Sequence, residues 1–218
     1  MGDVHIYCIS GLGADFRIFS KLRIKGAVLH PIHWEIPGRH ATLPSFALEL
    51  SKQIKHSNPV LLGVSYGGML STEIAKNVPV SRAIIVSSCK QRSELPLYMR
   101  VAGAAGLHKV LPYWLVTQNK FLNRLIFDTR SREEELYLKR LMLTGSNLTL
   151  IRRSVNMILH WQNEELPANL VHIHGEKDKL LLPFGIRADY WVPDGGHFMI
   201  WNKANDVSAI IQDEIRGL

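Results

Sequence analysis

Short, continuously apolar segments alternate with helix-like segments through the first ninety or so residues and again near the end of the chain. Apolar runs without an alternating polar side are typical of parallel strands that helices cover on both faces. The pattern therefore predicts an α/β fold with a mostly parallel sheet of about six strands flanked by helices. The expected strands cover residues 4–10, 27–34, 59–64, 82–88, 170–174 and 189–192.

Apolar positions between these strands recur at helical spacing. A short helix is expected over residues 15–22, with Asp15 as its cap. Further helices are expected over residues 45–55 and 66–77. The chain closes with a helix whose apolar positions share one face, and these are Val207, Ile210, Ile211 and Ile215.

Residues 91–162 contain helix-like segments and no strand-like segment. This change predicts a helical lid of residues 91–162, inserted into a core formed by residues 1–90 and 163–218.

Two helices of the insertion have start and stop signals. Ser131 and Glu134 have the spacing of a capping box, and Gly145 is expected to end that helix. A second helix is expected from about Asn147. Most of their apolar residues are expected to pack rather than to carry chemistry.

The segment LLGVSYGGML, residues 61–70, places Ser65 between Gly63 and Gly67. An expected strand precedes it and an expected helix follows it. Such a sharp turn can hold a serine in a strained conformation, and the flanking glycines prevent clashes with neighbouring chain. A serine hydroxyl also needs a base, an acid that orients the base, and donors for the oxyanion. Ser65 is the candidate nucleophile, and the alternative is a glycine-rich bend that merely contains a serine.

Two later loops contain candidates for the base and the acid. His197 follows a Gly-Gly pair after the last expected strand, at the sheet edge where α/β proteins bind ligands. Asp178 lies in the loop after the strand at 170–174. We prefer Asp178 as the acid because the loop must extend beyond the strand end to reach the histidine. Glu176 in the same loop is the alternative.

The oxyanion donors are expected to be backbone amides. One is the amide of Tyr66, directly after the candidate nucleophile. The other is the amide of Leu12, in the glycine loop that follows the first strand. The alternative for this loop is a plain glycine turn.

Five features in chain order resemble the α/β-hydrolase superfamily over nearly the whole chain. They are the early glycine loop, the turn at Ser65, the helical insertion, the His-Gly-x-x-Asp segment ending at Asp178, and the Gly-Gly-His loop ending at His197. The resemblance implies that Ser65 is the nucleophile, His197 the general base and acid, and Asp178 its partner. It implies a serine hydrolase of the esterase or thioesterase type, acting on a small acyl substrate through an acyl-enzyme. We expect no cofactor and no metal.

The chain departs from the pattern of this superfamily in two places. Its first strand matches the strand that is usually third, so we expect the N-terminal antiparallel hairpin to be absent. The oxyanion loop begins with Ser10 and Gly11 instead of His-Gly. Because the donor is a backbone amide, Ser10 should change how the loop is braced rather than abolish the hole.

Fold and triad do not determine the reaction. The same scaffold could run acyl transfer, C–C hydrolysis or lyase chemistry. A ligand receptor or interaction module that kept the pocket is the alternative from a different class.

Charge and cysteine content add limits on partners and compartment. The formal charge is +7, but the basic residues are spread along the chain and no zinc-finger, RNP or basic-zipper signature accompanies them. We expect no nucleic-acid partner.

No apolar run reaches the length of a membrane span, and the first residues do not resemble a secretory signal. Cys8 and Cys89 are expected to be buried reduced thiols in a cytoplasmic protein. The oligomeric state is left open.

The remaining histidines receive no catalytic role. His172 and His174 face the same way on a strand, and we favour packing over a metal pair. His5, His30 and His33 are assigned nothing.

Three tryptophans could line a pocket under the insertion. They are Trp114, Trp161 and Trp201. Structural packing is favoured for them, because aromatic side chains bury large areas wherever they occur.

Overall fold

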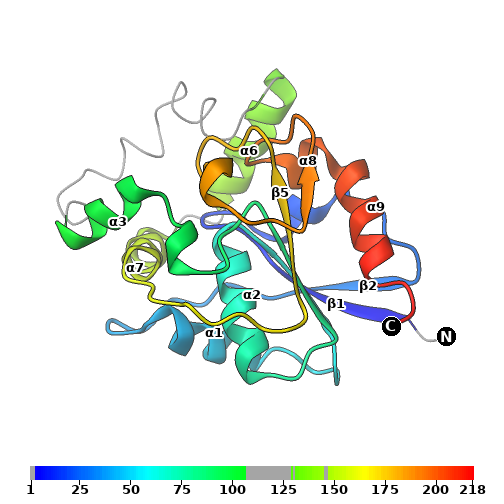
Figure 1. Ribbon diagram of the computed structural model, residues 1–218, viewed down its shortest axis with the longest axis horizontal. Helices are drawn as coiled ribbons and strands as arrows, with labels where there is room; N and C mark the ends of the chain where they lie inside the picture. The colour runs from blue at the N-terminus through cyan, green and yellow to red at the C-terminus, as the bar shows by residue number, and fades with distance from the viewer. Residues whose placement is uncertain (1–2, 107–128, 130, 145–146) are drawn as a thin grey trace.

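The computed structural model describes residues 3–106, 129, 131–144 and 147–218. Within these residues six strands form one sheet in the order β2-β1-β3-β4-β5-β6, and every neighbouring pair runs parallel (Figure 1). This confirms the predicted parallel sheet flanked by helices. The strands are β1 (Val4–Ile9), β2 (Ala27–Pro31), β3 (Val60–Val64), β4 (Arg82–Val86), β5 (Leu170–Gly175) and β6 (Tyr190–Val192).

Helices connect the strands and form the segment between β4 and β5. The 3₁₀ helices are η1 (Phe16–Phe19), η2 (Arg92–Glu94) and η4 (Pro183–Gly185). The α-helices are α1 (Leu43–Ser51), α2 (Tyr66–Asn77), α3 (Leu97–Ala104), α6 (Arg132–Thr144), α7 (Leu148–Leu159), α8 (Met199–Asn202) and α9 (Ala204–Glu214).

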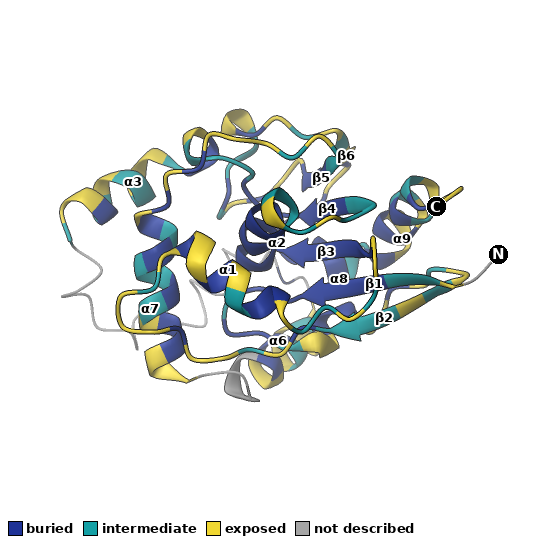
Figure 2. Ribbon diagram, turned by 90° about the horizontal axis from the view of Figure 1, so that it is seen from below, coloured by how far each residue is buried: buried dark blue, intermediate teal, exposed yellow. Residues whose placement is uncertain are grey.

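Two hydrophobic layers cover the two faces of the sheet. On one face, α1 and α2 pack against alternate residues of β1 and β3, such as Tyr7 and Leu61. The other face of the sheet presents the intervening residues of the same strands, such as Cys8 and Leu62. These pack against η1, α6, α8 and α9. All five residues of β3 are buried, and the central strands appear dark blue in Figure 2. Burial on both faces explains why these strands are continuously apolar in the sequence.

Several helix boundaries differ from the sequence prediction. The first is a 3₁₀ turn, and Asp15 caps it as expected by accepting a hydrogen bond from the Arg17 amide. Helix α1 begins earlier than predicted, because Thr42 and Ser45 form a reciprocal capping box. The predicted closing helix is α9, and its predicted apolar face packs in one core; the short helix α8 precedes it, separated by the non-helical backbone at Lys203 (φ −120°, ψ 31°).

Two of the helix signals predicted for the insertion are found in the structure. The Ser131 hydroxyl accepts a hydrogen bond from the Glu134 amide at 3.1 Å, and Asn147 caps α7 through the amides of Thr149 and Leu150. Gly145 lies outside the described residues.

The described helices of the insertion lie in two places. In Figure 2 the strands β1, β2 and β3 point toward α3 and α7. Helix α6 lies instead against the face of the sheet that η1, α8 and α9 cover, where Leu138 and Leu141 join their core. The insertion therefore shares its core with the sheet, and the division into a core and a lid stays a prediction.

Both cysteines are buried and free, as predicted. No helix in the described part of the chain has the length and apolar character needed to cross a membrane.

Candidate active site

Ser65 lies on a strained turn between β3 and α2. Its backbone has φ 53° and ψ −119°, a left-handed conformation that costs a non-glycine residue about 1–3 kcal/mol. Hydrogen bonds hold this conformation on both sides. The Ser65 amide donates to the carbonyl of Val86 at 2.9 Å, and the Ser88 hydroxyl donates to the Ser65 carbonyl at 2.7 Å. The end of β4 therefore braces the turn.

The glycines around Ser65 are required by close backbone contacts. A Cβ atom on Gly67 would lie 2.1 Å from the carbonyl oxygen of Ile9, at the end of β1. A Cβ atom on Gly63 would lie 2.3 Å from the carbonyl oxygen of Gly67. One on Gly68 would lie 2.4 Å from the hydroxyl of Ser88. The turn thus packs backbone to backbone against the end of β1, which no larger residue permits.

Ser65, His197 and Asp178 form one hydrogen-bonded chain. His197 Nε2 lies 3.0 Å from Ser65 Oγ, and His197 Nδ1 lies 2.8 Å from Asp178 Oδ2. A carboxylate accepts, so Nδ1 carries the proton and Nε2 is the acceptor for the serine hydroxyl. The three residues follow β3, β5 and β6, whose carboxyl ends meet at one edge of the sheet. This arrangement can activate a hydroxyl for nucleophilic attack.

Asp178 is buried, with 1% of its surface exposed, and its two oxygens have separate partners. Oδ1 accepts hydrogen bonds from the amides of Leu180 and Leu181, both at 2.9 Å, while Oδ2 contacts His197. Burial by itself raises the pKa of this carboxyl, but His197, His174 and the Leu181 amide outweigh it and hold the pKa below its usual range. The alternative acid, Glu176, is exposed. Geometry therefore brings Asp178, and not Glu176, to the histidine.

His172 and His174 support the loop that carries Asp178. His174 Nε2 donates to the carbonyl of Leu181 at 2.9 Å, so His174 Nδ1 accepts from Nε2 of His172 at 3.2 Å. Burial lowers the pKa of both rings, which keeps them neutral. His174 thus holds Leu181 by its carbonyl, while the Leu181 amide donates to Asp178. The sequence contains this pair, but its link to the acid appears only in the fold.

The two expected oxyanion donors lie around Ser65. A Cβ atom on Gly11 would lie 3.5 Å from Ser65 Cβ, so the glycine loop after β1 lies directly against the serine. Leu12 follows in this loop, and Tyr66 begins α2. Within the described residues neither amide donates a hydrogen bond to the protein. Within the described part of the chain, both amides therefore lack a backbone acceptor, and their role as oxyanion donors stays a prediction.

Trp34 braces the glycine loop, and sequence reasoning gave it no role. Its indole Nε1 donates to the carbonyl of Ala14 at 2.8 Å and lies 2.9 Å from Ser10 Oγ, which itself donates to that carbonyl at 2.8 Å. The indole also stacks on the ring of Tyr66, with centroids 5.5 Å apart. Ser10 therefore braces the loop directly, and Trp34 adds a donor to the same two oxygens. Trp34 ends an expected strand, a position that could have suggested a place near the site.

A cavity of about 780 Å³ opens between α1, α2 and α7. Trp161 lines it and donates through Nε1 to the buried carboxylate of Glu73 at 2.7 Å. Ser65 is not among its lining residues, so we do not assign this cavity to the acyl group. Trp201 is buried in the other core layer, and Trp114 lies outside the described residues.

Comparison with known proteins identifies the family. The sequence model of the alpha/beta hydrolase family matches residues 4–209, which is most of the chain. The chain is a member of the alpha/beta hydrolase family. No curated protein sequence matches it.

Several solved structures that resemble this alpha/beta hydrolase are named as esterases. An esterase from Thermogutta terrifontis has a TM-score of 0.73 at 16% identity, covering 99% of this chain and 91% of that one. A lipase-esterase related protein from Clostridium acetobutylicum has a TM-score of 0.71 at 18% identity, covering 98% and 95%. An esterase from Exiguobacterium antarcticum has a TM-score of 0.66 at 17% identity, covering 100% and 94%. At this identity the likeness establishes the fold.

Replacing Gly67 by alanine should destabilise the protein by about 1–3 kcal/mol or more, because the new Cβ overlaps the carbonyl of Ile9. Gly38→Ala is the matched control, since a Cβ there meets nothing within 4 Å, and its effect should stay within about 1 kcal/mol. Urea unfolding of both variants measures the difference. Equal stabilities would contradict the close packing of the turn.

The depressed pKa of Asp178 predicts a loss of stability in acid. Its ionised form stabilises the native state above the unfolded pKa of about 3.9, and this contribution is lost as the pH falls through the lower native pKa. The free energy of unfolding of wild type minus that of Asp178→Asn should therefore be larger at pH 7 than at pH 3. Denaturant titrations at both pH values measure it, and a gap that does not shrink in acid would count against this assignment.

Proposed function

We propose that this alpha/beta hydrolase is a serine hydrolase that cleaves a small carboxylic ester or thioester through an acyl-enzyme intermediate. The observation that carries the proposal is the unbroken hydrogen-bonded chain from Ser65 through His197 to Asp178, with the serine on a strained turn. Strain of this kind persists only where the surrounding contacts hold it, and it aims the serine oxygen out of the turn.

In the acylation step, Ser65 Oγ attacks the carbonyl carbon of the substrate while His197 Nε2 takes the hydroxyl proton. The carbonyl oxygen becomes an oxyanion, which the amides of Leu12 and Tyr66 bind. The bond to the leaving alcohol or thiol then breaks, and the imidazolium gives its proton to the leaving group. Asp178 stays ionised throughout and stabilises the imidazolium.

In the deacylation step, water takes the place of the leaving group. His197 removes a proton from the water, which attacks the acyl carbon. When the second tetrahedral intermediate breaks down, the carboxylic acid leaves and the proton returns to Ser65 Oγ. No cofactor or metal enters either step.

The ester specificity is supported by the solved structures of like fold that are named esterases. We propose that residues 91–162 cover the site and shape acyl selectivity, because α3 and α7 stand beyond the carboxyl ends of the strands. Acyl transfer, C–C hydrolysis and lyase chemistry use the same groups. Acyl esters and thioesters assayed with and without an added alcohol acceptor separate hydrolysis from acyl transfer, and a β-diketone tests C–C hydrolysis.

Labelling with a fluorophosphonate probe tests the nucleophile. Wild type should be labelled, and Ser65→Ala should not, with kcat toward a p-nitrophenyl ester falling on the order of 10⁶-fold. Ser71→Ala is the control, because this buried hydroxyl lies further along α2, one turn after Gly67, and donates to the Gly67 carbonyl. Labelling that persists in Ser65→Ala would rule out Ser65, and an unlabelled wild type would favour a ligand receptor.

Paired carboxamide variants test the acid. Asp178→Asn should lower kcat about 10⁴-fold, because the amide favours the wrong tautomer of His197. Glu176→Gln should leave kcat near the wild-type value, since Glu176 is exposed. Steady-state kinetics on one ester measure both. A loss confined to Glu176→Gln would transfer the role to Glu176.

A further inference from the structure

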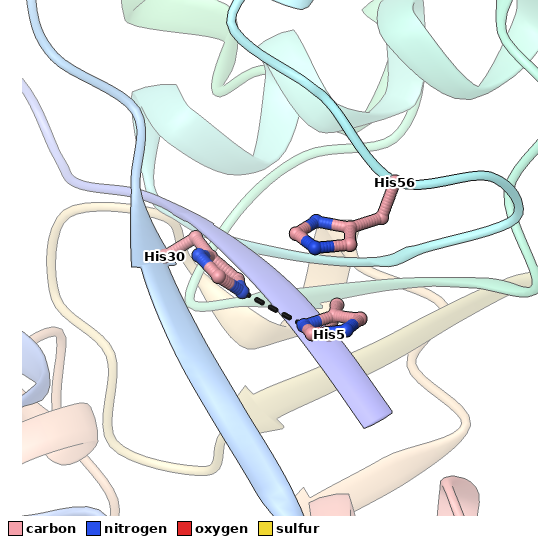
Figure 3. Close-up of side chains that lie close together, drawn as sticks. All are labelled: His5, His30 and His56. Carbon is pink, nitrogen blue, oxygen red and sulfur yellow. Dashed lines mark hydrogen bonds between the residues drawn. The ribbon is translucent and has the colours of Figure 1, made fainter. Parts of the chain in front are cut away.

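We propose that His5, His30 and His56 form a binding site for a borderline divalent cation, with Zn²⁺ as its type, at the end of the sheet remote from Ser65. Among the described residues these three side chains make up the group of candidate ligands whose donor atoms all lie within 4.8 Å of one another. They come from β1, from β2 and from the loop between α1 and β3 (Figure 3). Convergence of three imidazoles from three segments is the observation that carries the proposal.

The three rings lie near enough to one another for their nitrogens to reach one metal ion after a change of side-chain conformation. His5 Nδ1 lies 2.9 Å from His30 Nε2, and the His5 and His56 rings stack with centroids 3.5 Å apart. Bonds of about 2.0–2.1 Å from zinc to nitrogen hold tetrahedral ligand atoms roughly 3.3 Å apart. A metal lies in the plane of each ring that binds it, so the stacked pair must open. We expect a rotation of the His5 side chain to open the pair when the metal binds.

His56 is held in place by a buried residue. The hydroxyl of Tyr7 contacts His56 Nδ1 at 2.8 Å and accepts a hydrogen bond from the Lys55 amide at 2.8 Å. The other ring nitrogen, Nε2, is then the one offered to a metal. When Nε2 binds, the ring keeps its proton on Nδ1 and donates it to the tyrosine oxygen. Partners of this kind fix the orientation of metal-binding histidines in proteins.

The donor set selects the metal. Neutral imidazole nitrogens suit zinc, copper and nickel, whereas calcium and magnesium require oxygen ligands. All three side chains are partly exposed, so an ion can reach them and a water can complete a tetrahedral zinc site.

The site is separate from the hydrolytic centre. His5 lies near the start of β1, while the glycine loop beside Ser65 follows its end at Ile9, about 13 Å away at roughly 3.3 Å per residue. A bound ion would tie the edge strand β2 and the α1–β3 loop to β1. Its expected effect is therefore on stability and not on turnover.

Titration of the tag-free protein with Zn²⁺ against a chromophoric chelator tests the proposal. Wild type should bind one Zn²⁺ per chain, and the melting temperature should rise by about 5–10 °C at one hundred times Kd. His30→Gln and His56→Gln should abolish the melting shift. Tyr7→Phe should weaken binding about 10–100-fold while keeping the ring packed. His56 lies in a loop, so its variant tests the site even where a strand variant fails to fold.

Two controls separate this site from other histidines. His33→Gln, an exposed neighbour outside the cluster, should bind Zn²⁺ as wild type does. Ser65→Ala should also keep full Zn²⁺ affinity, so failure of the hydrolase proposal leaves this result unaffected. Absence of Zn²⁺ binding by wild type, or equal affinity in His30→Gln and His56→Gln, would overturn the proposal.

Discussion

The close contact between the turn at Ser65 and the end of β1 is the constraint on which the site depends. Gly67 lies so near the carbonyl of Ile9 that no side chain fits, and the glycine loop after β1 is thereby brought against Ser65. The same contact brings the glycine loop that contains Leu12 next to the turn after which Tyr66 begins α2. The proposed mechanism uses this arrangement, because backbone dipoles stabilise a transition state best where they are already in place before the reaction.

Strain at Ser65 is balanced by hydrogen bonds from the neighbouring strand. The end of β4 supplies both the carbonyl of Val86 and the hydroxyl of Ser88 to the turn. On the acid side, the buried His172–His174 pair fixes the loop whose amides hold Asp178. The residues that meet in the site are therefore each held by a second set of contacts, and most of these contacts are with backbone atoms.

The two ends of the sheet carry different groups of polar side chains. Loops at the carboxyl ends of β3, β5 and β6 bring together a serine, an acid and a histidine, as is general for ligand sites in α/β folds. The histidine cluster near the start of β1 lies away from this edge and uses an edge strand. One chain thus offers two sites that can be perturbed independently.

The sequence by itself determined the parallel sheet, because strands buried on both faces must be continuously apolar. It also singled out Ser65, Asp178 and His197 as candidates, because a glycine-flanked turn and two loops after strands are local patterns. The limits of α1 were less accurate, since its start depends on the capping side chains of Thr42 and Ser45.

Only the tertiary structure decided which carboxylate meets the histidine, that Trp34 braces the glycine loop, and that Ser88 braces the turn at Ser65. It alone brought His5, His30 and His56 together. These contacts join segments far apart in the chain, and the distance between two such segments follows from how the layers pack. Hydrophobic periodicity specifies which face of an element is buried, but not which polar side chains then meet across the sheet.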